Sequence, residues 1–266
     1  MTYKKERGMG MELKIPENFF VGAAMSGPQT EGAYKTGGRL ESIWDTWSDL
    51  SISDFYNKVG SYVGNNFYEK YEDDIKLLKS LHMDSFRTSM QWSRLLTKDG
   101  KLNQEGAQFY HKVCKCAKEN QIELFMNLYH FDMPTYLFER GGWESRDVVE
   151  AYAAYARAAF REFGSEIRYW FTFNEPIVEP DQRYRNGFWY PFIKDAKRGM
   201  QVQYHLSLAH SLAVWEFRKA KEEGYVREDA KKKLQLQGAR QMVNFWICLF
   251  LASVLGISVS FLRLPE

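Results

Sequence analysis

YWFTFNEP, the stretch Tyr169–Pro176, decides the fold of this chain. Its first five residues are aromatic or β-branched, which predicts a short buried strand. An amide, a carboxylate and a proline follow, so the chain leaves the sheet as Asn174 and Glu175 appear. In a parallel sheet ringed by helices, chemistry is placed at the carboxyl ends of the strands. A carboxyl group held beside aromatic walls has a raised pKa and can donate a proton near neutral pH. The alternative is that Glu175 only caps the next turn.

Three further apolar segments predict strands, and amphipathic segments separate them. The first helical segment places Phe67, Tyr71 and Ile75 at i, i+4 and i+8, which is one helical face. Asn103 is predicted to cap the second helix. Strands that alternate with helices favour a parallel sheet. The predicted strands cover residues 19–24, 84–89, 123–128 and 169–173, and the predicted helices cover residues 66–81, 104–119, 146–163 and 194–221.

These four β/α units use the chain up to about residue 221. A (β/α)8 barrel with units of this length would need roughly twice as many residues. The predicted fold class is therefore α/β, of the (β/α)8 TIM-barrel family. The barrel is expected to be truncated, with about four β/α units.

Three connections are predicted as loops. Met25–Gly32 is rich in small residues, which would let backbone approach a ligand closely, and it offers the polar side chains Gln29 and Glu31. The alternative for this segment is a plain turn. Residues 42–47 hold two tryptophans and are expected to pack a loop against the rim of the barrel, and residues 181–191 are expected to form an aromatic loop.

Two more polar residues accompany the predicted strands. Arg87 lies inside the second strand, where a buried cation needs a partner. It either pairs with a catalytic carboxylate or belongs to a structural ion pair. His130 follows the third strand, just ahead of a proline, as Glu175 follows the fourth. It can donate to sugar hydroxyls, although a histidine with a purely structural role is the commoner case.

The composition argues against several classes of function. The net charge is +2 without a basic stripe, so nucleic acid is not an expected partner. Three cysteines give no disulfide framework, and no Cys/His cluster has zinc-ligand spacing, so no metal and no cofactor are expected. The first residues lack the apolar core of a secretion signal, which predicts a cytoplasmic location. The aromatic content of 16% suits stacking on sugar rings or, more simply, a large aromatic core.

Four motifs, in order, resemble those of glycoside hydrolase family 1, the retaining β-glycosidases. The likeness runs from about residue 15 to residue 221. Two positions depart from the pattern, because Pro28 stands where an aromatic residue or histidine is usual and Phe131 stands where tryptophan is usual. The motifs are FVGAAMSGPQTEGA at residues 20–33, FRTSMQWSR at residues 86–94, YHFDMP at residues 129–134 and TFNEP at residues 172–176.

The resemblance implies a role for each candidate residue. Glu175 would be the general acid/base, Asn174 would bond the 2-hydroxyl of the sugar, and Arg87 would lie against the nucleophile. A retaining enzyme needs two carboxyl groups about 5–5.5 Å apart, one to attack and one to move the proton. The implied substrate-binding residues are Gln29, His130, Phe131 and Asn174.

The first motif looks most like the bacterial 6-phospho-β-glucosidase branch of the family. The resemblance therefore implies hydrolysis of β-glycosidic bonds, with 6-phospho-β-glucosides as substrates and a small glycoside or phosphoglycoside as the partner. Unphosphorylated β-glucosides and 6-phospho-β-galactosides remain alternatives.

The second half of the family pattern is missing. The family's nucleophile lies in a Glu-Asn-Gly motif, and that motif occurs nowhere in the 266 residues. Phe245–Leu262 is instead an uncharged run long enough to span a membrane. Either the tail is an anchor, or the reading frame was lost near Lys231–Lys233; we favour the second and expect no membrane association. The expected divisions are an extension at residues 1–14, the N-terminal half of a barrel at residues 15–225 and an atypical tail at residues 226–266.

Three functions from different classes fit the sequence. The chain is a glycosidase that is active only when the missing half is supplied, a sugar-binding remnant without turnover, or the product of a broken gene with no function of its own. Hydrolysis of a chromogenic β-glucoside and its 6-phosphate distinguishes the first from the others.

Self-association is also expected, because an incomplete barrel exposes sheet edges and apolar surface. We predict that the isolated chain dimerises or has low solubility. Size-exclusion chromatography with light scattering measures this, and a clean, stable monomer would contradict the prediction.

Overall fold

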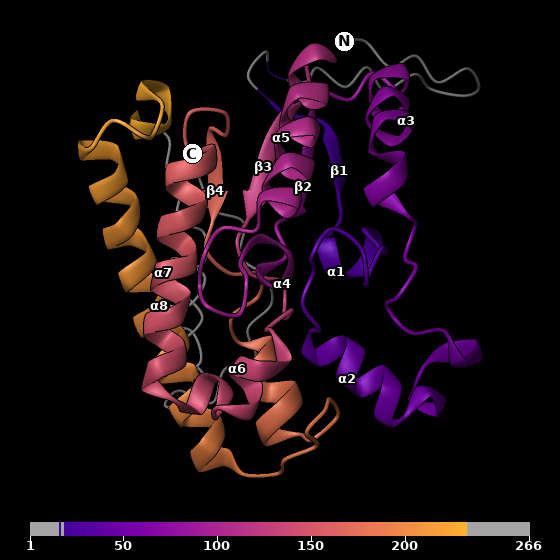
Figure 1. The fold of residues 1–266 in the computed structure, drawn as a ribbon, viewed down its shortest axis with the longest axis vertical. Helices are drawn as coiled ribbons and strands as arrows, with labels where there is room; N and C mark the ends of the chain where they lie inside the picture. Colours follow the sequence, from indigo (N-terminus) through magenta and orange to yellow (C-terminus); the bar gives the residue numbers. More distant parts are fainter. Residues whose placement is uncertain (1–15, 17–18, 233–266) are drawn as a thin grey trace, which may run out of the picture.

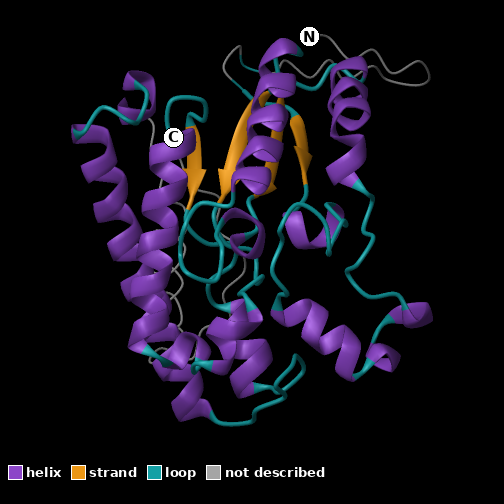
Figure 2. Cartoon of the chain, viewed as in Figure 1, coloured by secondary structure: helices purple, strands orange, loops and turns teal. Residues whose placement is uncertain are grey.

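The chain folds around a four-stranded parallel sheet. The structure, a computed structural model, describes residue 16 and residues 19–232. The strands lie in the order β1-β2-β3-β4, and each pairs in parallel with the next, so their arrows point the same way (Figure 2). The parallel sheet is therefore confirmed, with shorter strands than the apolar runs suggest. The strands are β1 (Gly22–Ala24), β2 (Ser85–Ser89), β3 (Glu123–Asn127) and β4 (Tyr169–Phe171).

All four predicted helices are present. Each follows a strand, and α5 and α7 lie in front of the sheet in Figure 1 with α8 beside α7. The last helix begins at a true side-chain cap, because the carboxylate of Asp195 accepts hydrogen bonds from the backbone N–H groups of Lys197 and Arg198 at 2.9 and 3.1 Å. These long helices are α3 (Phe67–Ser80), α5 (Gln104–Glu119), α7 (Arg146–Phe163) and α8 (Ala196–Glu222).

Short helices occupy the connections. Most of them gather at the carboxyl ends of the strands (Figure 2). They are α1 (Gly27–Thr30), α2 (Ile43–Leu50), η1 (Ile52–Asp54), η2 (Tyr56–Lys58), α4 (Trp92–Leu95), α6 (Thr135–Glu139), η3 (Gly142–Glu144), η4 (Pro180–Arg185) and η5 (Glu228–Lys232).

The loop predictions for residues 42–47 and 181–191 were wrong in part. The first segment is the start of α2, because Asp45 accepts a hydrogen bond from the backbone N–H of Ser42 at 2.8 Å and so caps the helix. The second segment begins with the helical turn η4 before it becomes a loop. Asn103 does precede α5, but its side chain does not cap that helix and instead donates to the carbonyls of Gly37 and Arg94.

The small residues of Met25–Gly32 serve packing inside the protein. Gly27 begins α1, and its backbone N–H donates to the Ser89 hydroxyl at 2.9 Å. A Cβ atom at Gly27 would lie 2.9 Å from the Ser89 carbonyl oxygen and 2.7 Å from Cγ of Gln91. The close approach expected toward a ligand is therefore made toward β2 and the residues that follow it.

An aromatic core fills the space between α7 and the sheet. Trp92 stacks on Tyr155 with ring centroids 5.2 Å apart, and Tyr152 stacks on Phe173 at 4.6 Å. Each such buried ring contributes about 1.5–3 kcal/mol relative to an exposed one. The Tyr155 hydroxyl also donates to the carbonyl of Leu128 at 2.9 Å, at the end of β3. The core thus fixes α7 to the strand ends where the candidate residues lie.

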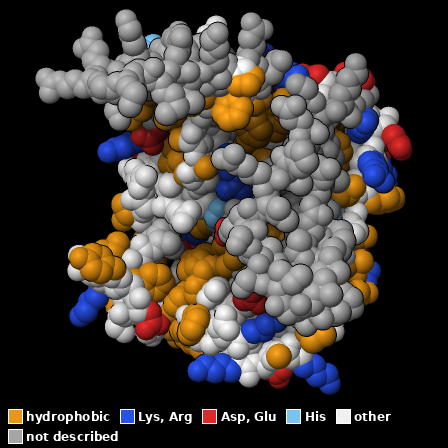
Figure 3. All heavy atoms as spheres, turned by 180° about the vertical axis from the view of Figure 1, so that it is seen from behind, with side chains coloured by type: hydrophobic (Ala, Val, Ile, Leu, Met, Phe, Trp, Pro, Cys, Tyr) orange, Lys and Arg blue, Asp and Glu red, His pale blue; other side chains and the backbone are white. Residues whose placement is uncertain are grey.

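The two outer helices carry exposed apolar side chains. Leu77 on α3 is 56% exposed, and on α8 Met200, Tyr204 and Trp215 are 61%, 60% and 54% exposed. Seen from behind, orange hydrophobic side chains form several surface patches (Figure 3). We expect self-association to use these surfaces and the outer edges of β1 and β4.

Within the described residues, no helix is both long enough and apolar enough to cross a membrane. The apolar run Phe245–Leu262 lies outside the described residues.

Candidate active site

The polar residues after β3 and β4 are held side by side by backbone hydrogen bonds. The pairing continues past both strands, because the Leu128 N–H donates to the Phe171 carbonyl at 2.8 Å and the Asn174 N–H donates to the Tyr129 carbonyl at 2.9 Å. The segments that follow β3 and β4 therefore leave the sheet side by side. This brings His130 and Glu175 to the same edge.

Arg87, Asn174 and Glu175 form one hydrogen-bonded chain across this edge. The Arg87 guanidinium donates to Oδ1 of Asn174 at 2.7 Å, and Nδ2 of Asn174 donates to Oε2 of Glu175 at 3.2 Å. Both polar ends of the amide are thus engaged, which fixes its orientation. The guanidinium also lies 5.7 Å from the ring centroid of Phe171.

Arg87 is connected to Glu175 through the side-chain amide of Asn174. Among the described residues its hydrogen bond goes to Asn174, and the predicted pairing with the nucleophile carboxylate stays a prediction, because the Glu-Asn-Gly motif does not occur in the sequence. Burial lowers the pKa of Arg87, and the charge of Glu175 acts in the opposite direction. The charge of Glu175 is thus close enough to act on the guanidinium without a direct hydrogen bond.

Glu175 is exposed, which differs from the prediction of a carboxyl group enclosed by aromatic walls. Its backbone has φ of 39°, in the left-handed region that side chains other than glycine rarely adopt. Such strained residues concentrate at functional sites. The proline that follows ends the turn, so Glu175 stands at a constrained corner that leads away from the sheet.

His130 is half-buried beside Arg87. Burial, followed by the charge of Arg87, lowers the pKa of His130 to about 4, so the imidazole is neutral at pH 7. Its Nδ1 atom is buried and has no hydrogen-bond partner among the residues that the structure describes. A neutral imidazole with a free ring nitrogen is suited to a polar, uncharged ligand group.

Phe131 is buried and also has a left-handed backbone, with φ of 66°. Its ring packs against Trp189, with centroids 5.2 Å apart. Phe131 therefore connects the end of β3 with the aromatic loop after η4.

Gln29 lies on α1, directly after β1, and is exposed. Its Oε1 atom accepts a hydrogen bond from the Ser26 hydroxyl at 2.5 Å. In the part of the chain that is described, Gln29 therefore shares the carboxyl edge of the sheet with the other candidates but is not bonded to them.

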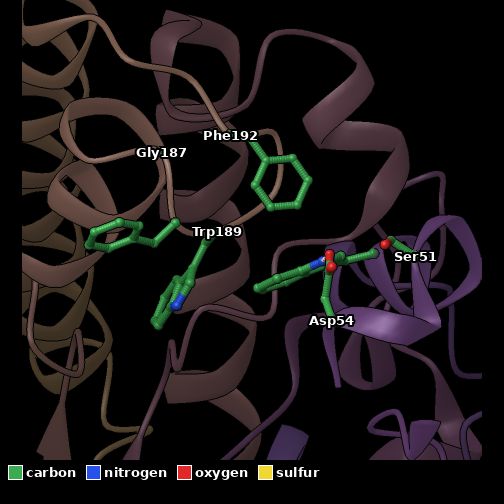
Figure 4. Close-up of a pocket in the computed structure, with 7 residues that line it drawn as sticks. Ser51, Asp54, Gly187, Trp189 and Phe192 are labelled. Atoms are coloured by element: carbon green, nitrogen blue, oxygen red, sulfur yellow. Dashed lines mark hydrogen bonds between the residues drawn. The ribbon is translucent and has the colours of Figure 1, made fainter. Parts of the chain in front are cut away.

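An open cavity of about 660 Å³ lies between α2–η1 and the aromatic loop. Figure 4 shows the Trp189 and Phe192 side chains on one side of it and Asp54 and Ser51 on the other. The sequence prediction recorded the aromatic loop but gave it no role. The signal was the run Gly187–Pro191, in which three aromatic residues follow a glycine. The lining residues are Trp47, Ser51, Asp54, Gly187, Phe188, Trp189 and Phe192.

The comparisons with known proteins agree with this geometry. Residues 11–236 match the sequence model of glycosyl hydrolase family 1. The chain belongs to this family. Its fold is that of the (β/α)8 barrels of family 1, and the described residues form four of the β/α units. Within those residues, no group of three or more His, Cys, Asp or Glu side chains could hold a metal ion.

Similar family 1 proteins include phosphoglucosidases and glucosidases. The chain is 40% identical over 216 residues to the 6-phospho-β-glucosidase GmuD of Bacillus subtilis, which covers 81% of this chain and 46% of GmuD. It is 36% identical over 208 residues to β-glucosidase A of Acetivibrio thermocellus, covering 78% and 46%. The β-glucosidase of Thermotoga maritima in complex with deoxynojirimycin has a TM-score of 0.75 at 31% identity, over 79% of this chain and 48% of that one. The chain thus spans about half the length of these family 1 relatives.

Asp132 makes folding stability depend on pH. It is fully buried and accepts hydrogen bonds from the backbone N–H groups of Trp92 and His130 at 2.9 and 3.0 Å. Burial raises its pKa to about 7, against the opposing effect of these donors. The folded protein therefore keeps a proton on Asp132 that the unfolded chain has lost between about pH 4 and pH 7, so the contribution of Asp132 to stability falls by about 1 kcal/mol per pH unit through this window, while the lowered pKa of His130 acts in the opposite direction.

Urea unfolding at pH 5, 6 and 7 measures this slope. Asp132→Asn cannot ionise, so its stability relative to the wild type is expected to increase from pH 5 to pH 7, whereas Asp73→Asn, at an exposed position on α3, should show no such trend. A stability difference between the wild type and Asp132→Asn that does not change from pH 5 to pH 7 would contradict the assignment.

Proposed function

We propose that this chain supplies the proton-donating and sugar-binding half of a retaining β-glycosidase site. The observation that carries the proposal is the chain of contacts from Arg87 through Asn174 to Glu175, at the carboxyl ends of parallel strands. Glu175 acts as the general acid/base. Its exposure gives it access to a glycosidic oxygen, and the hydrogen bond from Asn174 orients its carboxyl group.

The sugar is held by the groups around the acid. Asn174 bonds the 2-hydroxyl, and the neutral imidazole of His130 forms a hydrogen bond with another hydroxyl. Gln29 bonds the glycone from the end of β1, and Phe131 forms an apolar wall. The open cavity, with its aromatic lining, takes the leaving group.

Turnover requires a second carboxyl group. In a retaining mechanism it attacks the anomeric carbon while Glu175 protonates the leaving oxygen, and Glu175 then removes a proton from water. Arg87 lies beside Glu175 and would hold that nucleophile. Since the Glu-Asn-Gly motif is absent from the sequence, we propose that activity depends on a polypeptide that provides the other half of the barrel.

A 6-phosphoglucoside is the favoured substrate, because the 40% identity to GmuD extends over 216 residues, whereas the same identity to a β-glucosidase extends over 166. The test compares p-nitrophenyl β-glucoside with its 6-phosphate, using this chain alone and this chain co-expressed with the C-terminal half of GmuD. The proposal expects hydrolysis only in the co-expressed sample, faster on the phosphate. No hydrolysis of either compound by a soluble, co-purifying pair would rule the proposal out.

A second candidate function is sugar binding without turnover, which the missing Glu-Asn-Gly motif favours. Calorimetry with deoxynojirimycin and glucose 6-phosphate tests it on the isolated chain. Binding by the isolated chain together with an inactive co-expressed pair would support this candidate over the first.

A further inference from the structure

We propose that Arg183 is a positioning residue that fixes the aromatic wall of the cavity and sets its affinity for a planar aromatic leaving group. The inference builds on the proposed function, which places the leaving group in this cavity. Arg183 is not among the residues that line the cavity, and its hydrogen bonds go to Glu179, Tyr190 and Phe131 and not to Glu175. It acts through the Trp189 side chain and the loop that carries it.

Arg183 is completely buried on η4. Its Nε donates to Oε1 of Glu179 at 3.0 Å, and its two remaining nitrogens donate to the backbone carbonyls of Tyr190 and, at 3.5 Å, Phe131. One side chain thus joins the aromatic loop to the end of β3. Because the guanidinium is planar with donors in a fixed fork, these bonds fix direction as well as distance.

The guanidinium also contacts two tryptophans. It lies 5.4 Å from the ring centroid of Trp44, on α2, and 5.4 Å from that of Trp189, in the loop. The two indoles contact each other edge to face, with centroids 5.1 Å apart. Arg183 therefore contacts both elements that line the cavity, since Trp47 belongs to the same helix α2 as Trp44 and Trp189 belongs to the loop.

Glu179 gives Arg183 a rigid base. Its Oε2 atom accepts a hydrogen bond from the buried Tyr129 hydroxyl at 2.7 Å, and that hydroxyl accepts one from Nε1 of Trp143 at 3.0 Å. Both partners belong to the aromatic core. The loop is thus held through Arg183 and Glu179 by the aromatic core.

Loss of the guanidinium releases the Tyr190 carbonyl and the Trp189 ring together. The wall then has no charged donor to fix its position, so a flat ligand loses its stacking partner. Asn174 keeps its bonds to Arg87 and Glu175, neither of which involves Arg183. Phe131 loses only the 3.5 Å hydrogen bond to its backbone carbonyl. Arg183 should therefore affect the affinity for an aromatic group and leave the affinity for a sugar ring unchanged.

Three variants and a matched control test the inference in the full chain. Arg183→Met removes all donors, but it leaves Glu179 as an unpaired buried charge, which is destabilising. The pair Glu179→Gln with Arg183→Met removes both charges, and Arg183→Lys keeps the ion pair but cannot bond both carbonyls. The control is Arg185→Met, because Arg185 lies on the same turn and pairs with Asp181 but contacts neither tryptophan.

Calorimetry measures the binding of p-nitrophenyl β-glucoside and of deoxynojirimycin, which has no aromatic group. We expect each Arg183 variant that retains the wild-type far-UV circular dichroism to bind the aryl glucoside about tenfold more weakly. Deoxynojirimycin affinity should be unchanged in these variants, and the control should bind both as the wild type does. Unchanged aryl-glucoside affinity in a folded variant, or an equal loss for both compounds, would overturn the inference.

The near-ultraviolet circular dichroism of the tryptophans separates this inference from the proposed function. If the wild-type chain binds neither compound, the proposed function is still judged by hydrolysis in the assembled pair. The positioning role is then decided by Arg183→Lys, which we expect to change the tryptophan bands while the control does not. An unchanged spectrum in Arg183→Lys would reject the positioning role.

Discussion

Glu175→Gln is expected to lower the turnover of p-nitrophenyl β-glucosides by about 10²–10⁴-fold in the barrel assembled from this chain and the C-terminal half of GmuD. Glutamine keeps the size of the side chain and can still accept from Asn174, but it cannot donate a proton to the leaving oxygen or take one from water. The measurement is kcat for the 6-phosphate, compared with kcat for the assembled wild-type pair.

Comparing two leaving groups tests whether the function lost in Glu175→Gln is proton donation. A 2,4-dinitrophenolate leaves without protonation, so the first chemical step should be nearly unaffected for that substrate in Glu175→Gln. A burst of dinitrophenol followed by slow turnover is then expected, because the loss is confined to the second step. The matched control is Glu139→Gln, an exposed position on α6, which should keep wild-type rates. Equal losses in the rate of the first chemical step for both leaving groups would show that Glu175 has another role.

The long helices could be predicted because local chemistry specifies them. The bounds of α5 and α7 agree with the predicted residues 104–119 and 146–163, since apolar residues recur on one face over several turns. Helix α2 was not predicted, because its two tryptophans were interpreted as packing contacts of a loop although a helix start signal precedes them. Ser42 followed by Asp45 is a capping pattern that sequence alone displays.

The sequence could predict which residues form the site but not which of them contact one another. The motifs indicated Arg87, Asn174 and Glu175, yet Arg87 and Asn174 are 87 positions apart, and their hydrogen bond depends on how three strands pair. The exposure of Glu175 likewise depends on tertiary packing. For Glu179 and Arg183, the i, i+4 spacing of opposite charges was a visible signal, but it is more often a surface pair than a buried one.

Removal of Glu31 is expected to have the largest effect on stability. Its carboxylate is buried, and its Oε2 atom accepts from Nε of Arg94 at 2.7 Å and from Nε2 of Gln91 at 2.6 Å. Its other oxygen accepts from the Tyr110 hydroxyl at 2.8 Å. Glu31→Ala leaves the fully buried Arg94 guanidinium without a counter-charge, which costs about 3–5 kcal/mol.

Urea unfolding monitored by circular dichroism measures this loss, with Glu72→Ala as the control. Glu72 pairs with Lys76 at 3.4 Å, but both side chains are more than half exposed, so its removal should cost about 1 kcal/mol at most. Adding Arg94→Met to Glu31→Ala should recover part of the lost stability, because no unpaired charge remains. A cost for Glu31→Ala no larger than the control's would contradict this account.

The removal of Glu31 should also weaken sugar binding, because Glu31 directly follows the short helix that carries Gln29. The Glu31–Arg94 pair holds the chain after β1 against α4, and Arg94 further donates to the Gly32 carbonyl at 3.1 Å. Without that anchor, Gln29 has only its hydrogen bond with Ser26 among the described contacts to fix it. The double variant Glu31→Ala with Arg94→Met should therefore bind deoxynojirimycin more weakly than the wild type even where it remains folded, whereas Glu72→Ala should not.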